Sequence, residues 1–283
     1  MNFGVSTWLW TSPFNTSSIG LFPKIKEMGF SHVEIPVEDP DIIDASEVRR
    51  ALDANALKAI VCGAFGPTRD LTHKDPAVHQ VCFDYLDRCF EFCLAWDTKF
   101  VAGPMYSAVG KTRLLPPDER KREWDLAITN LRKVSERAAT HGLFLAIESL
   151  NRFESDLVNT AEDLLRLVTD INHPSAKIML DSFHMTLEER DLAKAIITVG
   201  DHLIHMQVSE NYRGAPGTGL TPWTELKKGL DAVNYDGVIS IESFTPSNQE
   251  LAGAVCIWKP IAISQDQFAI DGLAFLKSLY SST

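Results

Sequence analysis

The chain has few of the features that mark membrane, secreted or nucleic-acid-binding proteins. No apolar run approaches the roughly 18 residues needed to cross a bilayer, and the opening segment MNFGVSTWLW lacks the basic stretch of a secretory signal. Only 27 Lys and Arg accompany 38 Asp and Glu, which gives a formal net charge of −11. Surfaces that bind nucleic acid are usually basic. We therefore expect neither membrane contact nor a nucleic-acid partner.

Cysteine is also scarce. The chain has five cysteines, and their odd number and scattered positions favour reduced thiols and a cytoplasmic location. Three of them, Cys82, Cys89 and Cys93, are spaced to share one face of an expected helix. We interpret them as buried core thiols, because structural metal sites have a different spacing.

The sequence lacks a GxGxxG turn after its first β-rich segment, and such a turn would favour a doubly wound open sheet. Instead, short β-rich segments alternate with amphipathic helical patterns along the whole chain. This alternation predicts parallel strands joined by right-handed crossovers, and eight repeats predict one closed (β/α)8 TIM barrel over residues 1–283. The expected strands are 3–9, 32–37, 58–65, 99–106, 144–150, 176–183, 203–209 and 238–244.

Polar side chains lie near the ends of the last four expected strands. They are Glu148 in AIES, Asp181 in MLDSFH, Gln207 in HMQVS and Glu242 in SIES. In TIM barrels, residues at the carboxyl ends of the strands build the active site. We therefore expect these four side chains to converge on one site.

Three neighbouring buried carboxylates require a counter-charge. One solution is a divalent cation, and oxygen ligands favour Mn²⁺ or Mg²⁺. The other is a set of buried salt bridges, for which Arg213 is the obvious partner. With a cation present, paired glutamates can move a proton next to a carbonyl group.

Longer strings carry a resemblance to a known family. AIESLNRFESDLVNTAEDLLRLV, IMLDSFHMTLEE, SENYRGAPGTG and ISIESF resemble the xylose-isomerase-like TIM-barrel superfamily of sugar phosphate isomerases and epimerases, and within it the D-tagatose and D-psicose (ketose) 3-epimerases. The resemblance extends along nearly the whole chain. It implies a sugar epimerase or isomerase that depends on a divalent metal, with Mn²⁺ expected and Mg²⁺ or Co²⁺ as alternatives. Its substrate would be a small ketose or keto-sugar, deprotonated next to the carbonyl to form a metal-stabilised enediolate.

The resemblance also implies roles for individual residues. Glu148, Asp181 and Glu242 correspond to metal ligands, and Glu148 with Glu242 to the acid/base pair. Residues expected to contact substrate oxygens are His184, Arg213 and Glu154. Candidates for an aromatic wall beside the sugar are Trp8, Phe65 and Tyr106, each with core packing as its alternative.

One position departs from the family pattern. The family string is H-x-H-x-S-E-N, with the second histidine as a metal ligand, whereas this chain has HMQVSEN and thus Gln207 at that position. We expect the Gln207 amide oxygen to be the fourth ligand. His205 lies two residues earlier, about 6.6 Å deeper along a strand, and is expected in the barrel interior.

Other functions use a similar site. The main alternative is a metal-dependent lyase on an oxidised sugar or inositol, such as the catalytic subunit of a C-glycoside deglycosidase acting on 3-oxo-glycosides, or an inosose dehydratase. An apurinic-site endonuclease would need a histidine cluster and a basic groove, and a barrel that only binds sugar would not need both glutamates. The resemblance further implies a homo-oligomer (dimer or tetramer), or a hetero-oligomer with a small subunit if the protein is a deglycosidase.

Overall fold

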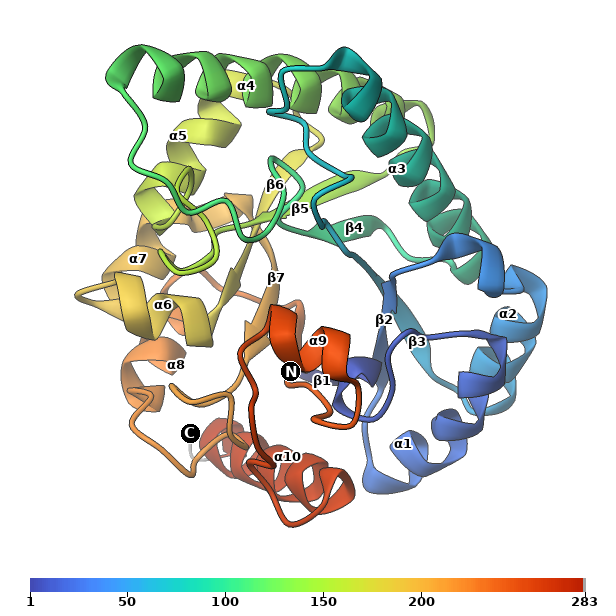
Figure 1. Cartoon of the computed structure of the whole chain (residues 1–283). Helices are drawn as coiled ribbons and strands as arrows, with labels where there is room; N and C mark the ends of the chain where they lie inside the picture. Colours follow the sequence, from blue (N-terminus) through green and yellow to red (C-terminus); the bar gives the residue numbers. More distant parts are fainter. Residues whose placement is uncertain (282–283) are drawn as a thin grey trace.

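The computed structural model describes residues 1–281, which form a closed barrel of parallel strands (Figure 1). Each strand pairs with its neighbours in sequence order, and β8 closes the barrel against β1. The predicted TIM barrel is therefore confirmed. The strands are β1 (Asn2–Ser6), β2 (His32–Val37), β3 (Lys58–Gly63), β4 (Phe100–Gly103), β5 (Phe144–Glu148), β6 (Ala176–Asp181), β7 (Leu203–Val208) and β8 (Val238–Ile241).

Helices surround the barrel and begin and end at residues with clear local signals. Gly29 ends α1 with a φ of 98°, and Thr160 with Asp163 forms a capping box at the start of α5. Within residues 1–281, no helix is both long and apolar enough to cross a membrane. The helices are α1 (Phe22–Met28), α2 (Ala45–Ala54), α3 (Pro76–Trp96), α4 (Pro117–Thr140), α5 (Ala161–Ile171), α6 (Ser182–Glu188), α7 (Leu192–Val199), α8 (Trp223–Ala232), α9 (Gln249–Ala254) and α10 (Gln265–Ser281).

Most strands end earlier than the sequence pattern predicts. β1 stops at Ser6 because Thr7–Leu9 forms a 3-10 turn. β6 stops at Asp181, whose carboxylate accepts a hydrogen bond from the Phe183 N–H and begins α6. Apolar residues continue beyond β1, β3 and β4 into the connections that follow, so hydrophobicity alone does not mark where these strands end. The short helices α6 and α9 were not predicted.

Alternation along the strands separates the core from the barrel interior. On β5, Leu145 and Ile147 join the main hydrophobic core, whereas Ala146 and Glu148 lie on the other face of the strand. The same two-residue period places Glu34 of β2, and Glu242 directly after β8, on the face opposite the core residues of those strands. The fold thus directs buried polar side chains from several strands into one enclosed space.

The helix α9 covers the barrel end where this space opens. In Figure 1 it lies in front of β1, near the middle of the ring of strands. Leu251 of α9 and Val255 directly after it line the same cavity as Glu148 and Glu242. The connection between β8 and α10 therefore forms one wall of the cavity.

A tyrosine joins the ends of two strands beside that cavity. The buried Tyr85 hydroxyl of α3 donates to the Val37 carbonyl at 2.5 Å and accepts from the Ala64 N–H at 2.8 Å. The change Tyr85→Phe leaves both groups without this partner and is expected to lower the free energy of unfolding by about 1–3 kcal/mol, measured by urea denaturation. The control is Tyr212→Phe, whose exposed hydroxyl contacts Thr218. Equal stability of the two variants would contradict a joining role for Tyr85.

Candidate active site

A cavity of about 380 Å³ opens at the carboxyl ends of the strands. Its volume suits a small molecule. Glu148 and Glu242 lie at its floor, with Asp181 and Gln207 fully buried and paired in register across β6 and β7. The structure therefore brings the four residues predicted from the late strands to one place. The other predicted residues that line the cavity are Glu154, His184, Arg213, Trp8 and Phe65.

One guanidinium group forms ion pairs with two of the buried carboxylates. Arg213 Nη1 lies 2.6 Å from Asp181 Oδ2 and 2.9 Å from Glu242 Oε2. Within residues 1–281, Glu148 and Glu34 each lie beside a histidine, His184 and His205, and no Lys or Arg pairs with either. Arg213 supplies part of the counter-charge, and most of the negative charge stays uncompensated.

The excess of buried carboxyl groups over cationic partners raises the pKa values of two of these groups. Burial raises the pKa of Glu148 well above its ordinary value, and the charges of Glu242 and Asp181 raise it further. Burial also raises the pKa of Glu242, to about 8, although Arg213 opposes this shift. The floor of the cavity therefore favours added positive charge.

The side chain of Gln207 has one paired and one unpaired end. Its Nε2 donates to Glu34 Oε1 at 2.5 Å and to Glu242 Oε1 at 3.0 Å. Its buried Oε1 has no hydrogen-bond partner, and an unpaired buried acceptor is costly. Carboxylate and amide oxygens are the ligands that hard divalent cations prefer. The residues present therefore fit such a cation.

Glu34 is a site residue that the sequence analysis missed. It is fully buried on β2, and its Oε2 lies 2.8 Å from His205 Nε2. His205 is itself fully buried, as predicted for an interior residue. The available signal was a lone carboxylate within the apolar segment HVEIPV, because an acid inside a strand needs a buried partner.

Asn151 fixes the protonation state of His184. The Asn151 N–H donates to His184 Nδ1 at 3.1 Å, so the proton of the neutral ring lies on Nε2. Burial lowers the pKa of His184 and favours this neutral form. Nε2 lies 3.5 Å from Glu148 Oε1 and 3.3 Å from Arg213 Nη2, so it faces the cavity beside both residues.

The loop after β7 holds Arg213 in place. Arg213 has a φ of 61°, an uncommon left-handed conformation for this residue type. The Ser243 hydroxyl donates to its carbonyl at 2.8 Å. Glu210 closes the loop by accepting from the Gly217 N–H and from Trp223 Nε1. This network directs the guanidinium into the site.

The predicted aromatic wall is present in part. Trp8 and Phe65 line the cavity, and the Trp8 ring lies 5.4 Å from that of Phe244, a lining residue that was not predicted. Tyr106 does not line it. Tyr106 is fully buried with its hydroxyl bonded to the Val158 carbonyl, so its alternative interpretation as core packing holds.

Known proteins resemble this chain over its full length. A probable ketose 3-epimerase of Synechocystis sp. is 30% identical over 282 residues, which cover 100% of this chain and 98% of that protein. An L-ribulose 3-epimerase of Methylomonas sp. is 27% identical over 89% of this chain and 88% of its own length. The crystal structure of a D-allulose 3-epimerase from Methylomonas sp. in complex with D-allulose matches 99% of this chain and 97% of that chain, with a TM-score of 0.92 at 25% identity.

A comparison of the chain with models of protein families points to the same fold as these relatives and as the closed barrel. Residues 22–279 match the family described as xylose isomerase-like TIM barrel. The chain belongs to that family.

Proposed function

We propose that the protein is a divalent-metal-dependent ketose 3-epimerase acting on an unphosphorylated ketose. The observation that carries the proposal is the pair Glu148 and Glu242 at the floor of the cavity, beside the unpaired amide oxygen of Gln207. The relatives described above are sugar 3-epimerases, which supports the same reaction here.

The charges around the cavity favour a neutral substrate. Its lining includes the acids Glu38, Asp39, Glu154 and Glu250, and among residues 1–281 Arg213 is the one Lys or Arg that lines it. Arg213 is already paired with two carboxylates. A phosphate or carboxylate on the substrate would therefore meet like charge without a free cationic partner.

The cation would be held by Glu148, Asp181, Gln207 and Glu242. Its donor atoms would be three carboxylates and one amide oxygen, a set that suits Mn²⁺, with Mg²⁺ or Co²⁺ as alternatives. When bound, it would hold adjacent substrate oxygens and stabilise the negative charge that develops on them.

Epimerisation requires removal of a proton from one face of C3 and delivery of a proton to the other. Glu148 ends β5 and Glu242 directly follows β8, which supplies two separate proton positions. Arg213 contacts Glu242 directly, so Glu242 is the more readily ionised of the two and accepts the proton in one direction. Glu148 then delivers a proton, and the roles exchange in the reverse reaction.

The remaining residues would bind and orient the sugar. His184 Nε2–H and Arg213 would donate hydrogen bonds to substrate oxygens next to the reacting carbon. Trp8, Phe65 and Phe244 line the cavity and would pack against the rest of the sugar and exclude water.

A lyase would begin with the same proton abstraction and differ in its second step. It would expel a leaving group from the carbon that is β to the carbonyl, instead of returning a proton to the α carbon. The relatives described above favour the epimerase.

The direct test is hydrogen exchange in D₂O with Mn²⁺. Fructose, tagatose, psicose, sorbose and ribulose would be offered separately from a 3-oxo-glucoside and an inosose, with NMR detection. We expect deuterium at C3 of a free ketose together with its 3-epimer. Silence on every ketose, with an elimination product from the oxidised substrates, would contradict the epimerase and support the lyase.

The change Glu242→Gln tests the acid/base role. Removing one proton-transfer group is expected to reduce C3 exchange by about 100-fold or more while the circular dichroism spectrum is unchanged. The matched control is Glu225→Gln at the exposed start of α8. Wild-type exchange by the Glu242→Gln variant would exclude Glu242 as an acid or base.

The change Gln207→Ala tests the proposed ligand. We expect Mn²⁺ affinity, measured by calorimetry, to fall about tenfold or more, whereas Gln207→His, which supplies a nitrogen ligand, retains binding. Gln80→Ala on the exposed face of α3 is the control. If Gln207→Ala binds Mn²⁺ as the wild type does, Gln207 is not a ligand.

A further inference from the structure

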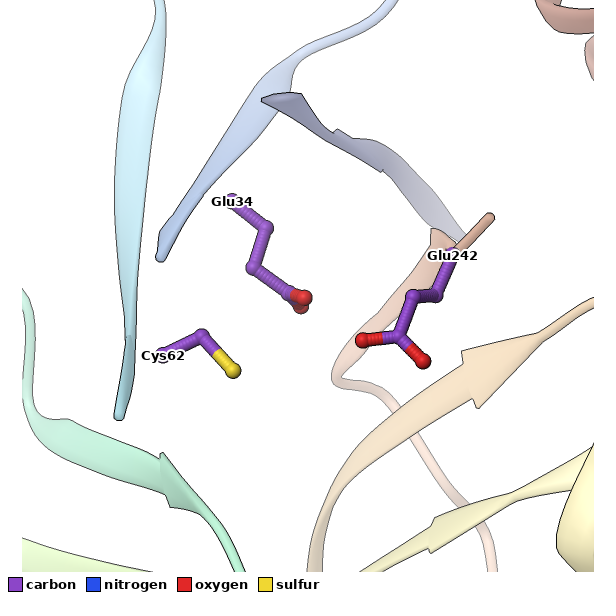
Figure 2. A group of neighbouring side chains, drawn as sticks. All are labelled: Glu34, Cys62 and Glu242. Carbon is purple, nitrogen blue, oxygen red and sulfur yellow. The ribbon is translucent and has the colours of Figure 1, made fainter. Parts of the chain in front are cut away.

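A second group of metal-binding side chains lies at the floor of the cavity. It consists of Glu34, Cys62 and Glu242, whose ligand atoms all lie within 4.8 Å of one another. Figure 2 shows the three side chains directed toward a common space from β2, β3 and the end of β8. All three are buried, and Cys62 and Glu242 line the cavity. The group is therefore within reach of an entering ion.

Gln207 reaches into this group with its amide nitrogen, and the oxygen of the same amide is unpaired. Its Nε2 contacts the carboxylates of both Glu34 and Glu242, and its fully buried Oε1 has no partner. Rotation of the amide by half a turn would exchange these two atoms. The oxygen would then face the space between the carboxylates, where it can serve as a ligand.

The Cys62 thiol is weakly engaged. Its Sγ lies 3.8 Å from the Gly63 carbonyl oxygen, and sulfur is a weak hydrogen-bond donor. A metal ion would therefore break no strong hydrogen bond of this atom, but it must displace a proton from a thiol whose pKa is raised by burial and by the neighbouring carboxylates. His205 Nε2 holds the outer oxygen of Glu34 at 2.8 Å, which is the kind of contact that orients a metal-binding carboxylate.

We propose that Glu34, Cys62, Glu242 and the Gln207 amide oxygen form a second cation position, selective for thiophilic divalent ions such as Zn²⁺ and Cd²⁺, for which Co²⁺ serves as the optical probe. Sulfur ligands favour these ions, whereas the all-oxygen position of Glu148 and Asp181 favours hard ions. On binding, the Cys62 thiol loses its proton to solvent and a metal–sulfur bond forms.

The second cation position and the proposed Mn²⁺ site cannot be occupied at the same time. Both require Glu242 and the single oxygen of Gln207, so a thiophilic ion bound to Cys62 removes two ligands from the proposed Mn²⁺ site. It also occupies the carboxylate proposed to accept the substrate proton. This consequence rests on the proposed function, whereas ion binding at Cys62 does not.

The test is an optical titration of the full-length, metal-free protein with Co²⁺ under reducing conditions. A Co²⁺–thiolate bond produces a sulfur-to-metal charge-transfer band, which oxygen and nitrogen ligands do not. We expect the wild-type protein to show this band, Cys62→Ser to lose it and Cys256→Ser to keep it. Cys256 is exposed and provides the matched control.

Two results would overturn the proposal: binding of Co²⁺ to the wild type without the band, or a band that persists in Cys62→Ser. The variant Glu34→Gln keeps the thiol and is expected to weaken the Co²⁺ affinity read from the band by about tenfold or more. Unchanged affinity in that variant would also overturn it. The band is independent of turnover, so a protein that shows the band with Co²⁺ but no C3 exchange when loaded with Mn²⁺ alone would refute the proposed function alone.

Discussion

The buried negative charge at one end of the barrel is the constraint on which the rest of the site depends. Glu34, Glu148, Asp181 and Glu242 are all buried, and Arg213 is the one guanidinium that contacts any of them within residues 1–281. Unpaired charge in such surroundings is strongly unfavourable. Raised carboxyl pKa values and an unpaired amide oxygen are two expressions of this constraint, and both indicate a place for a cation.

The alternation of side chains along the barrel strands brings these charged groups together. Strands alternate their side chains, so each strand that packs its apolar face on the helices presents its other face to the interior. Ala102, Ala146 and Met179 pack together in that interior, and the polar side chains follow at the carboxyl ends of the strands. The connections after β7 and β8 then add Arg213 and α9, which shape the cavity above the charged floor.

Much of this arrangement could be predicted from the sequence. Glu148, Asp181, Gln207 and Glu242 each end an apolar segment, so their convergence follows once the segments are recognised as successive barrel strands. Glu34 and Cys62 lie within apolar segments, and such residues look like core until the register of the strands is known. Tyr106 follows an apolar segment as a site residue would, but its side chain is fully buried in the core and does not reach the cavity. The helix α9 is short and its position over the barrel depends on tertiary contacts, which no local pattern encodes.

The central claim is that a hard divalent cation occupies the floor of the cavity with Gln207 as a ligand. It is tested most directly by anomalous diffraction from crystals grown with Mn²⁺. We expect one anomalous peak at coordination distance from Glu148, Asp181, Glu242 and the amide oxygen of Gln207. A peak that leaves Gln207 uncoordinated, or the absence of any peak at these residues, would contradict the account.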